Sequence, residues 1–272
     1  MRRIWLLTAA LAWALWGAAF PSLAAEEPEA VVTRREKGLV DWTQNYVEAT
    51  GTAVAPKGMT GAQAKAMARR GAMLDLQRNL LEFLNGVQID AYSVIGDSDT
   101  VRSELHGVIK NVEAIDGTWD GEAYTIRGRV RMEQLRRAVA PVAASRVKKT
   151  KSEPQPKTRE KKARYTGLVI DVRHLPYVPA MTFQVLDQNG RAVYGMGFVN
   201  QNSYLQSGLC AYISNINYAR GEVSVAPNPI VAKAVKLGQN NVDIVISNAD
   251  ASRVRSSSYN FRRECKVIVV CK

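Results

Sequence analysis

The sequence has few of the side chains that carry most enzyme chemistry. Its 272 residues include two histidines and three cysteines. His106 and His174 stand far apart, so a metal site or a Ser-His-Asp triad would have to recruit one of them alone. The cysteines show no C-x-x-C spacing, which argues against a zinc ribbon and thioredoxin-like chemistry. We expect neither histidine to act as a ligand or a catalytic base.

Short motifs for nucleotides, acyl transfer and calcium are missing as well. The chain has no Walker-type lysine loop and no G-x-S-x-G sequence. The stretch Gly195–Gly197 lacks the third glycine of a dinucleotide loop. The stretch Asp187–Gly190 lacks the alternating ligands and distal glutamate of a calcium loop. We expect both stretches to be turns, and we expect no cofactor, no metal and no catalytic residue.

One acidic cluster leaves a catalytic alternative open. Asp97 and Asp99 lie close together, and Glu104 follows them. Paired carboxyls can act as acid and base when burial separates their pKa values. Here the aspartates adjoin Gly96 and Ser98, which is typical of a loop with solvated acids. We favour the solvated loop and keep a hydrolase that uses these carboxyls as a further alternative.

The N-terminus has the three parts of a secretory signal peptide. Met1–Arg3 carries two arginines, Ile4–Phe20 carries no charge, and the small residues of Ser22–Ala24 follow Pro21. The apolar run is shorter than the roughly 20 residues that a membrane-spanning helix needs. No cysteine lies near the cleavage point to take a lipid anchor. We expect cleavage near Ala24, at the end of residues 1–24, and a mature protein in the periplasm or outside the cell.

The positive charge is concentrated in one segment. The chain has a formal charge of +12, and residues 145–164 contain nine Lys or Arg against two Glu, which makes +7. Two prolines and almost no large apolar residue predict an extended linker there. The alternative is contact with an envelope polyanion such as wall polymer, lipopolysaccharide or anionic lipid. Nucleic acid is not expected, because no aromatic residue is present to stack on bases. The candidate contacts are Arg146, Lys148, Lys149, Lys151, Lys157, Arg159, Lys161, Lys162 and Arg164.

The cysteines allow two interpretations. An exported protein meets oxidising conditions, under which disulfides form. Cys265 and Cys271 stand at opposite ends of one predicted strand, roughly 20 Å apart at about 3.3 Å per residue, which is too far for a mutual bond. One interpretation is therefore a disulfide between Cys210 and either Cys265 or Cys271. The other is three buried, unpaired thiols.

The linker divides the mature chain into two predicted domains, residues 32–144 and 165–272. Both mix helix-periodic segments with strand-like runs. We predict the α+β class for each domain, with a small, mostly antiparallel sheet and helices packed on it.

The first domain has the clearer local signals. We predict a strand at 39–53, a helix at 60–84, and a hairpin across Asp120–Gly121. The apolar helical positions, which include Met67 and Leu74, are expected to face the core. In the second domain, apolar runs predict strands at 167–172, 242–247 and 265–270.

One stretch resembles a known family. The segments Val40–Trp42, Tyr46–Gly51, Ala66–Ala72 and Asp75–Glu82, together with the hairpin Val108–Met132, carry the resemblance. Over about residues 39–135 the chain resembles the Lpp-twenty lipoprotein family and the related N-terminal domain of flagellar assembly protein T. The resemblance implies an envelope protein without catalysis, and the flagellar member implies a place in a periplasmic ring around the motor. This chain lacks the lipidated cysteine of the lipoprotein members.

These observations predict a periplasmic, non-enzymatic assembly or scaffold protein of the cell envelope, with a flagellum-related role implied by the resemblance. Its expected partners are envelope proteins, with peripheral contact to membrane or wall polymer as a further option. The alternative is a binding module for envelope polyanions that acts through residues 145–164.

Overall fold

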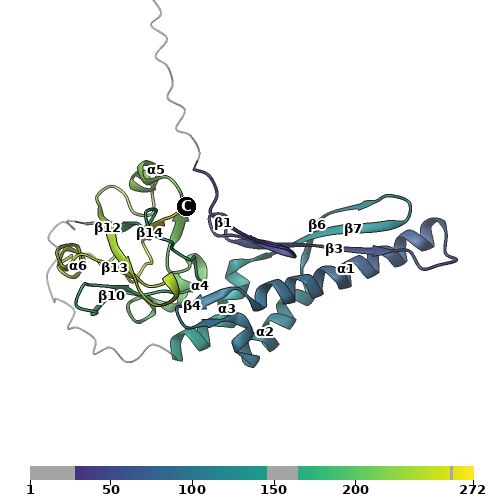
Figure 1. Ribbon diagram of the computed structural model, residues 1–272, viewed down its shortest axis with the longest axis horizontal. Helices are drawn as coiled ribbons and strands as arrows, with labels where there is room; N and C mark the ends of the chain where they lie inside the picture. Colours follow the sequence, from purple (N-terminus) through teal and green to yellow (C-terminus); the bar gives the residue numbers. More distant parts are fainter. Residues whose placement is uncertain (1–27, 146–164, 258–259) are drawn as a thin grey trace, which may run out of the picture.

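The computed structural model describes residues 28–145, 165–257 and 260–272. Two β-sheets with helices packed against them account for most of these residues, which confirms the predicted α+β class. The second sheet forms a rounded body, and part of the first sheet extends away from it as an arm (Figure 1). The predicted signal peptide and all nine candidate basic residues between 146 and 164 lie outside the described residues.

The first sheet has five antiparallel strands, as predicted for this half. In spatial order the strands are β1 (Val32–Arg35), β2 (Gly38–Asp41), β3 (Tyr46–Val54), β7 (Ala123–Arg131) and β6 (Glu113–Trp119). The single strand predicted at 39–53 is wrong, because a turn at residues 42–45 divides it into β2 and β3. Asn45 closes this turn with a φ of 60°, a left-handed conformation that asparagine tolerates well. The hairpin predicted across Asp120–Gly121 is confirmed by the pairing of β6 with β7.

Helix α1 (Gly61–Asn85) covers one face of this sheet and buries its alanine side. Its buried positions Ala64, Ala68, Ala72, Leu76 and Leu80 recur every four residues. Small side chains let the helix backbone approach β3 closely, so the alanines are selected for contact with the sheet. The prediction that Met67 and Leu74 face the core is therefore wrong: their side chains are 38% and 63% exposed.

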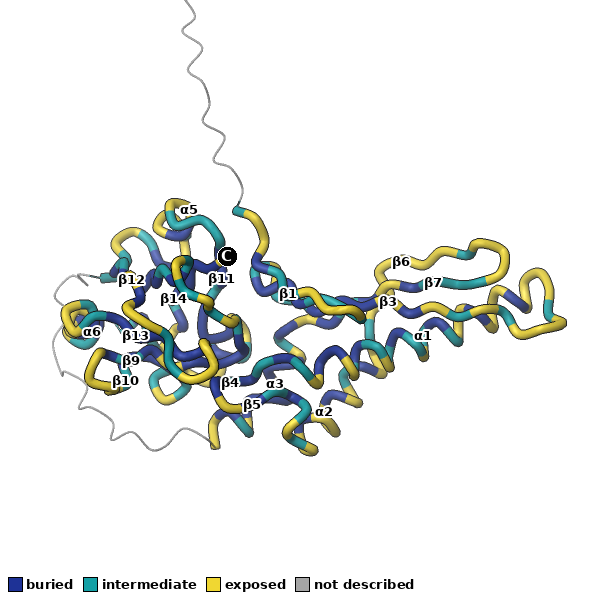
Figure 2. Tube along the Cα trace, viewed as in Figure 1, coloured by how far each residue is buried: buried dark blue, intermediate teal, exposed yellow. Residues whose placement is uncertain are grey.

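The arm consists of β3, the β6–β7 hairpin and the first half of α1 (Figure 1). Helices α2 (Asp99–Lys110) and α3 (Met132–Ser145) lie beside the second half of α1 and leave its first half uncovered on the side away from the sheet. Exposed residues consequently predominate on the outer parts of the arm, and every residue of β6 except Trp119 is exposed (Figure 2). The arm is therefore a two-layer element with one sheet and one helix.

The second sheet has seven strands of mixed direction. In spatial order they are β10 (Ala192–Tyr194), β9 (Val185–Leu186), β13 (Ile244–Ile246), β12 (Pro229–Leu237), β8 (Gly167–Asp171), β14 (Val267–Val270) and β11 (Ala211–Ile213). Four of the six pairings are parallel: β9 with β13, β8 with β12, β8 with β14, and β11 with β14. The prediction of a mostly antiparallel sheet is therefore wrong for this half.

The parallel pairings have no local signal in the sequence. Leu168–Ile170 and Val267–Val270 are apolar at every position because both faces of these strands are buried. A continuous apolar run reveals a buried strand but not the neighbour with which it pairs. The remaining elements of the described chain are β4 (Gln88–Asp90), β5 (Ser93–Val94), α4 (Gln201–Ser207), α5 (Ile216–Gly221), α6 (Asn248–Arg255), and the short 3-10 turns η1 (Ile95–Asp97), η2 (Met196–Phe198) and η3 (Gln239–Asn241).

We predict that Gly51→Ala destabilises the protein by about 2 to 3 kcal/mol, because the added methyl overpacks a tight contact. A Cβ at Gly51 would lie 2.6 Å from Leu76 Cα and would overlap the backbone of Ala72. Gly107→Ala in α2 is the matched control, since nothing lies within 4 Å of its Cβ position. There alanine should raise the free energy of unfolding by up to about 1 kcal/mol, because it favours the helix more than glycine does. Urea unfolding followed by circular dichroism measures both variants. Equal stability of Gly51→Ala and the parent would contradict this packing.

Candidate functional site

The two halves of the chain are joined by direct contact as well as by the intervening segment. Met181 N donates a hydrogen bond to Gln88 O at 3.1 Å, and Thr182 N donates one to Ile89 O at 2.7 Å. Strand β4 of the first half thereby binds the backbone of the second half. Buried apolar side chains from both halves also form one continuous core.

A buried cation, Arg136, lies at the centre of this junction. It comes from α3 in the first half, and it is only 5% exposed. Its Nε donates to Leu205 O at 3.0 Å and its Nη2 to Gln206 O at 2.6 Å, at the C-terminal end of α4 in the second half. Its Nη1 donates to Asn45 Oδ1 at 3.1 Å. Burial lowers the pKa of Arg136, while the negative end of the α4 dipole favours the cation.

The cavity beside Arg136 is small. It measures about 20 Å³ and is bordered by Trp42, Phe183, Cys210 and Tyr212 among others. The rings of Trp42 and Tyr212 meet edge to face there, with centroids 5.6 Å apart. This volume suits about one water molecule. The junction is therefore a packed joint rather than a pocket for a substrate.

All three cysteines are buried in the second half, and none forms a disulfide in the structure. Burial raises the pKa of Cys265 to about 11 and that of Cys271 to about 12. Burial also raises the pKa of Cys210. Because the thiolate is the reactive form, these thiols are chemically inert at neutral pH. The structure corresponds to the second interpretation of the sequence, three unpaired thiols.

The acidic cluster is dispersed over the start of α2. Asp97 Oδ2 accepts a hydrogen bond from Val94 N at 2.9 Å, which holds the η1 turn. Asp99 is paired with Arg102 at 3.1 Å, and its side chain is 98% exposed. Glu104 is also exposed. None of these carboxyls has the buried setting that acid–base catalysis by paired carboxyls requires.

The two histidines lie in separate places. His174 Nε2 forms a hydrogen bond with Ala234 O at 3.1 Å, within the second half. His106 is exposed on α2. Across residues 28–145, 165–257 and 260–272, no group of three His, Cys, Asp or Glu side chains could hold a metal ion. In the same ranges no helix has the length and apolar character to cross a membrane.

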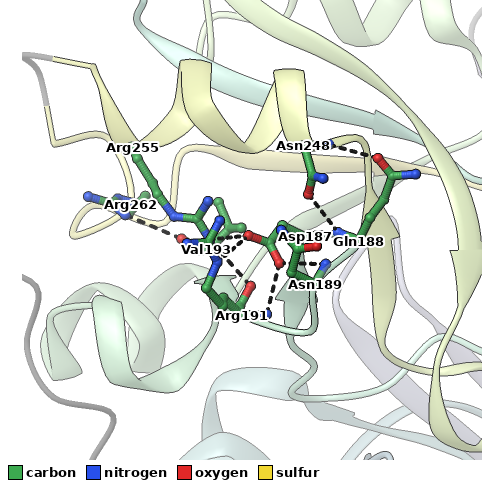
Figure 3. Close-up of polar contacts among 8 residues, drawn as sticks. All are labelled: Asp187, Gln188, Asn189, Arg191, Val193, Asn248, Arg255 and Arg262. Atoms are coloured by element: carbon green, nitrogen blue, oxygen red, sulfur yellow. Dashed lines mark hydrogen bonds and ion pairs between the residues drawn. The ribbon is translucent and has the colours of Figure 1, made fainter.

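The Asp187 carboxylate holds together the turn that the sequence predicts at Asp187–Gly190. The buried Asp187 carboxylate accepts hydrogen bonds from Asn189 N, from Arg191 N and Nε, and from Arg255 Nη2, at 2.9 to 3.0 Å (Figure 3). Burial by itself would raise the pKa of Asp187, but the hydrogen bonds from Arg191 and Arg255 lower it to about 2. The loop thereby ties the β9–β10 turn to α6. Its carboxylate is occupied by protein donors, so the loop has no resemblance to a calcium site.

One open groove does lie on the surface, between α1 and α2. Its volume is about 220 Å³. Leu81 and Leu105 form its apolar floor, while Arg78, Arg102 and His106 are on its polar border together with Glu82 and Asn85. Sequence reasoning missed this groove. The available signal was the seven-residue spacing of Met67, Leu74 and Leu81, which was interpreted as a core face.

Comparison with known proteins gives a family match for the second half of the chain. Residues 167–272 match the family described as Treponema pallidum Tp0624, second domain. The matched region begins at the first residue of β8 and includes all seven strands of the second sheet. No curated protein matches the chain. The resemblance of residues 39–135 to the Lpp-twenty family stays a prediction.

We predict that Arg136→Met costs about 3 kcal/mol of unfolding free energy, because carbonyls that now accept from a charged donor would lose it. Methionine keeps much of the side-chain volume and so separates the polar loss from cavity formation. Arg137→Met is the matched control. Arg137 is 68% exposed and pairs with Glu133 one turn away, and such a pair contributes about 0.5 kcal/mol or less. Urea unfolding of both variants measures the difference. Equal losses would show that Arg136 does not hold the junction.

We predict three thiols in the unfolded protein when no reductant has been used, because the structure holds Cys210, Cys265 and Cys271 unpaired. Ellman's reagent in guanidinium counts them. The folded protein should react far more slowly at pH 8, since burial keeps the thiols protonated. A count of one thiol would establish the disulfide alternative.

Proposed function

We propose that this protein is an exported, non-enzymatic assembly protein of the bacterial cell envelope, and that its mature chain acts in the periplasm. The observation that carries the proposal is the contrast between a packed body and an exposed arm. A body with buried, unpaired thiols and only a water-sized cavity at the described junction supports an arm that has surface on nearly every side. Such an arm is suited to contact other macromolecules rather than to enclose a substrate.

The sequence supports the same proposal independently of the fold. The first 24 residues have the pattern of a secretory signal. The segment that resembles the Lpp-twenty family and flagellar assembly protein T includes the whole arm, and it implies an envelope role without catalysis. A flagellum-related role is the specific form of this proposal. The Tp0624 match concerns the body and adds no activity.

The rival function is polyanion binding through residues 145–164. The observation in its favour is the net +7 of that segment. Such binding would be electrostatic, and it would weaken steeply as salt is added. The arm would then have no direct part in binding.

A crosslinked pull-down of the tagged mature protein from envelope fractions, at low and high salt, tests the proposal. A variant with all nine Lys and Arg residues between 146 and 164 changed to Gln separates the two functions. The assembly function predicts the same protein partners from parent and variant at both salt levels. Recovery of wall or lipid material alone, lost at high salt and in the variant, would contradict it and establish the rival.

A further inference from the structure

Helix α1 carries an apolar stripe that the described residues cover only at its Leu81 end. Met67, Leu74 and Leu81 recur every seven residues, which keeps them on one face of a helix. Their exposure is 38% for Met67 and 63% for Leu74, whereas Leu81 is half-buried. The sheet contacts the alanine side of α1 instead. The stripe is therefore available to an outside partner.

One cation flanks the stripe on the arm. Arg70 lies three residues after Met67 and four before Leu74, which places it beside the stripe, and it is exposed. Asp75 itself accepts a hydrogen bond from Thr52 N at 2.9 Å and pairs with Arg78. Asp75 is thus engaged within the protein, and the exposed Arg70 leaves a positive charge beside the stripe.

The stripe leads into the groove between α1 and α2. Leu81 and Leu105 form the floor of that groove, which measures about 220 Å³. Two cations border it, each paired with an aspartate of its own helix: Arg78 with Asp75 and Arg102 with Asp99, with side chains 71% and 49% exposed. Glu82 also lies there, but it is paired with Lys37 at 2.6 Å. The surface therefore combines an apolar line, an apolar end pocket and guanidinium groups beside both.

We propose that this stripe and groove are the docking surface for an acidic amphipathic helix of a partner protein. The proposal rests on the assembly function above and names the partner's chemistry. The partner helix would place apolar side chains seven residues apart along Met67, Leu74 and the groove. Its Glu or Asp residues would lie beside Arg70, Arg78 and Arg102.

The charges beside the stripe argue against a second copy of this chain as the occupant, and the width of the stripe argues against a bilayer. If a second copy of α1 packed antiparallel about Leu74, Arg70 of one copy would lie opposite Arg78 of the other, and the like charges would repel. A bilayer surface requires a broad apolar face with large side chains. The stripe is a single residue wide, which is too narrow for that.

A synthetic helix is the probe for this proposal. We would use a fluorescent peptide with leucines seven residues apart and glutamates between them, and measure its anisotropy with the full mature protein. One control peptide has the same composition with the leucines scattered around the helix, and another has lysine in place of glutamate. We expect binding of the first peptide alone, with affinity that falls as salt rises.

Variants locate the binding surface. Leu74→Gln should lower the affinity for the peptide by about tenfold, as expected for the loss of a central apolar contact. Val235→Gln is the matched control, since Val235 is a 47% exposed apolar residue on β12 of the body. Arg70→Gln combined with Arg78→Gln should remove most of the salt dependence, and Lys236→Gln on β12 is its control. Leu74 is an exposed side chain, so circular dichroism should show an unchanged fold.

Each of these results would overturn the proposal: equal binding of the scattered peptide, unchanged affinity of Leu74→Gln, loss of anionic vesicle binding in Leu74→Gln, or loss of self-association in that variant. The vesicle result would assign the stripe to lipid, and the self-association result would assign it to a second copy. The pull-down separates this proposal from the assembly function. If Leu74→Gln recovers the same envelope proteins as the parent, the docking surface is wrong while the assembly function stands. If the parent recovers no protein, the assembly function fails independently of the peptide result.

Discussion

The buried guanidinium of Arg136 is the interaction on which the arrangement of the two halves depends. Removing a cation from water is costly, and the cost is offset only when its donors are satisfied. Here the acceptors are two carbonyls at the end of α4 and the amide oxygen of Asn45. One side chain thereby connects α3, the turn between β2 and β3, and the second half of the chain. Slippage at the junction would leave a charge unsatisfied in the core.

This joint has a consequence for the arm. Helix α3 follows β7 directly in the chain, and β7 is a central strand of the first sheet. The α3 end of the arm's sheet is therefore anchored to the body, while the first half of α1 extends away from it (Figure 1). The sheet supports α1 along its alanine side and holds the helix straight before any partner arrives. A preformed helix binds with a smaller loss of conformational entropy than one that must fold on contact.

Elements with local signals could be predicted from the sequence. The hairpin at Asp120–Gly121 follows from its turn residues and the long helix after Thr60 from its apolar periodicity, although the Thr60 side chain forms no capping hydrogen bond; both suffice for the α+β class. The parallel neighbours of β8 could not be predicted, because a run of apolar residues does not identify its partner. The periodicity of α1 predicts Met67 and Leu74 in the core because apolar residues usually lie there. In the first half of the helix, however, close approach to the sheet favours alanine on the buried side, and Met67 and Leu74 lie outside.

The candidate site was harder to predict than the fold. Arg136 lies on the apolar face of α3, between Met132 and Val139, but nothing local in the sequence indicates the carbonyls that accept its hydrogen bonds. Its burial depends on α4, which is distant in sequence. The groove likewise requires α1 and α2 to lie side by side, and neither helix alone indicates it. In contrast, three buried, unpaired thiols were already one of the two interpretations that the sequence allowed.

Scanning calorimetry of the mature protein tests the central claim, that the arm and the body form one cooperative unit around Arg136. The account predicts one unfolding transition in which the calorimetric and van't Hoff enthalpies agree. Two separate transitions would contradict it. They would show that the two halves unfold independently and that the junction does not fix the arm to the body.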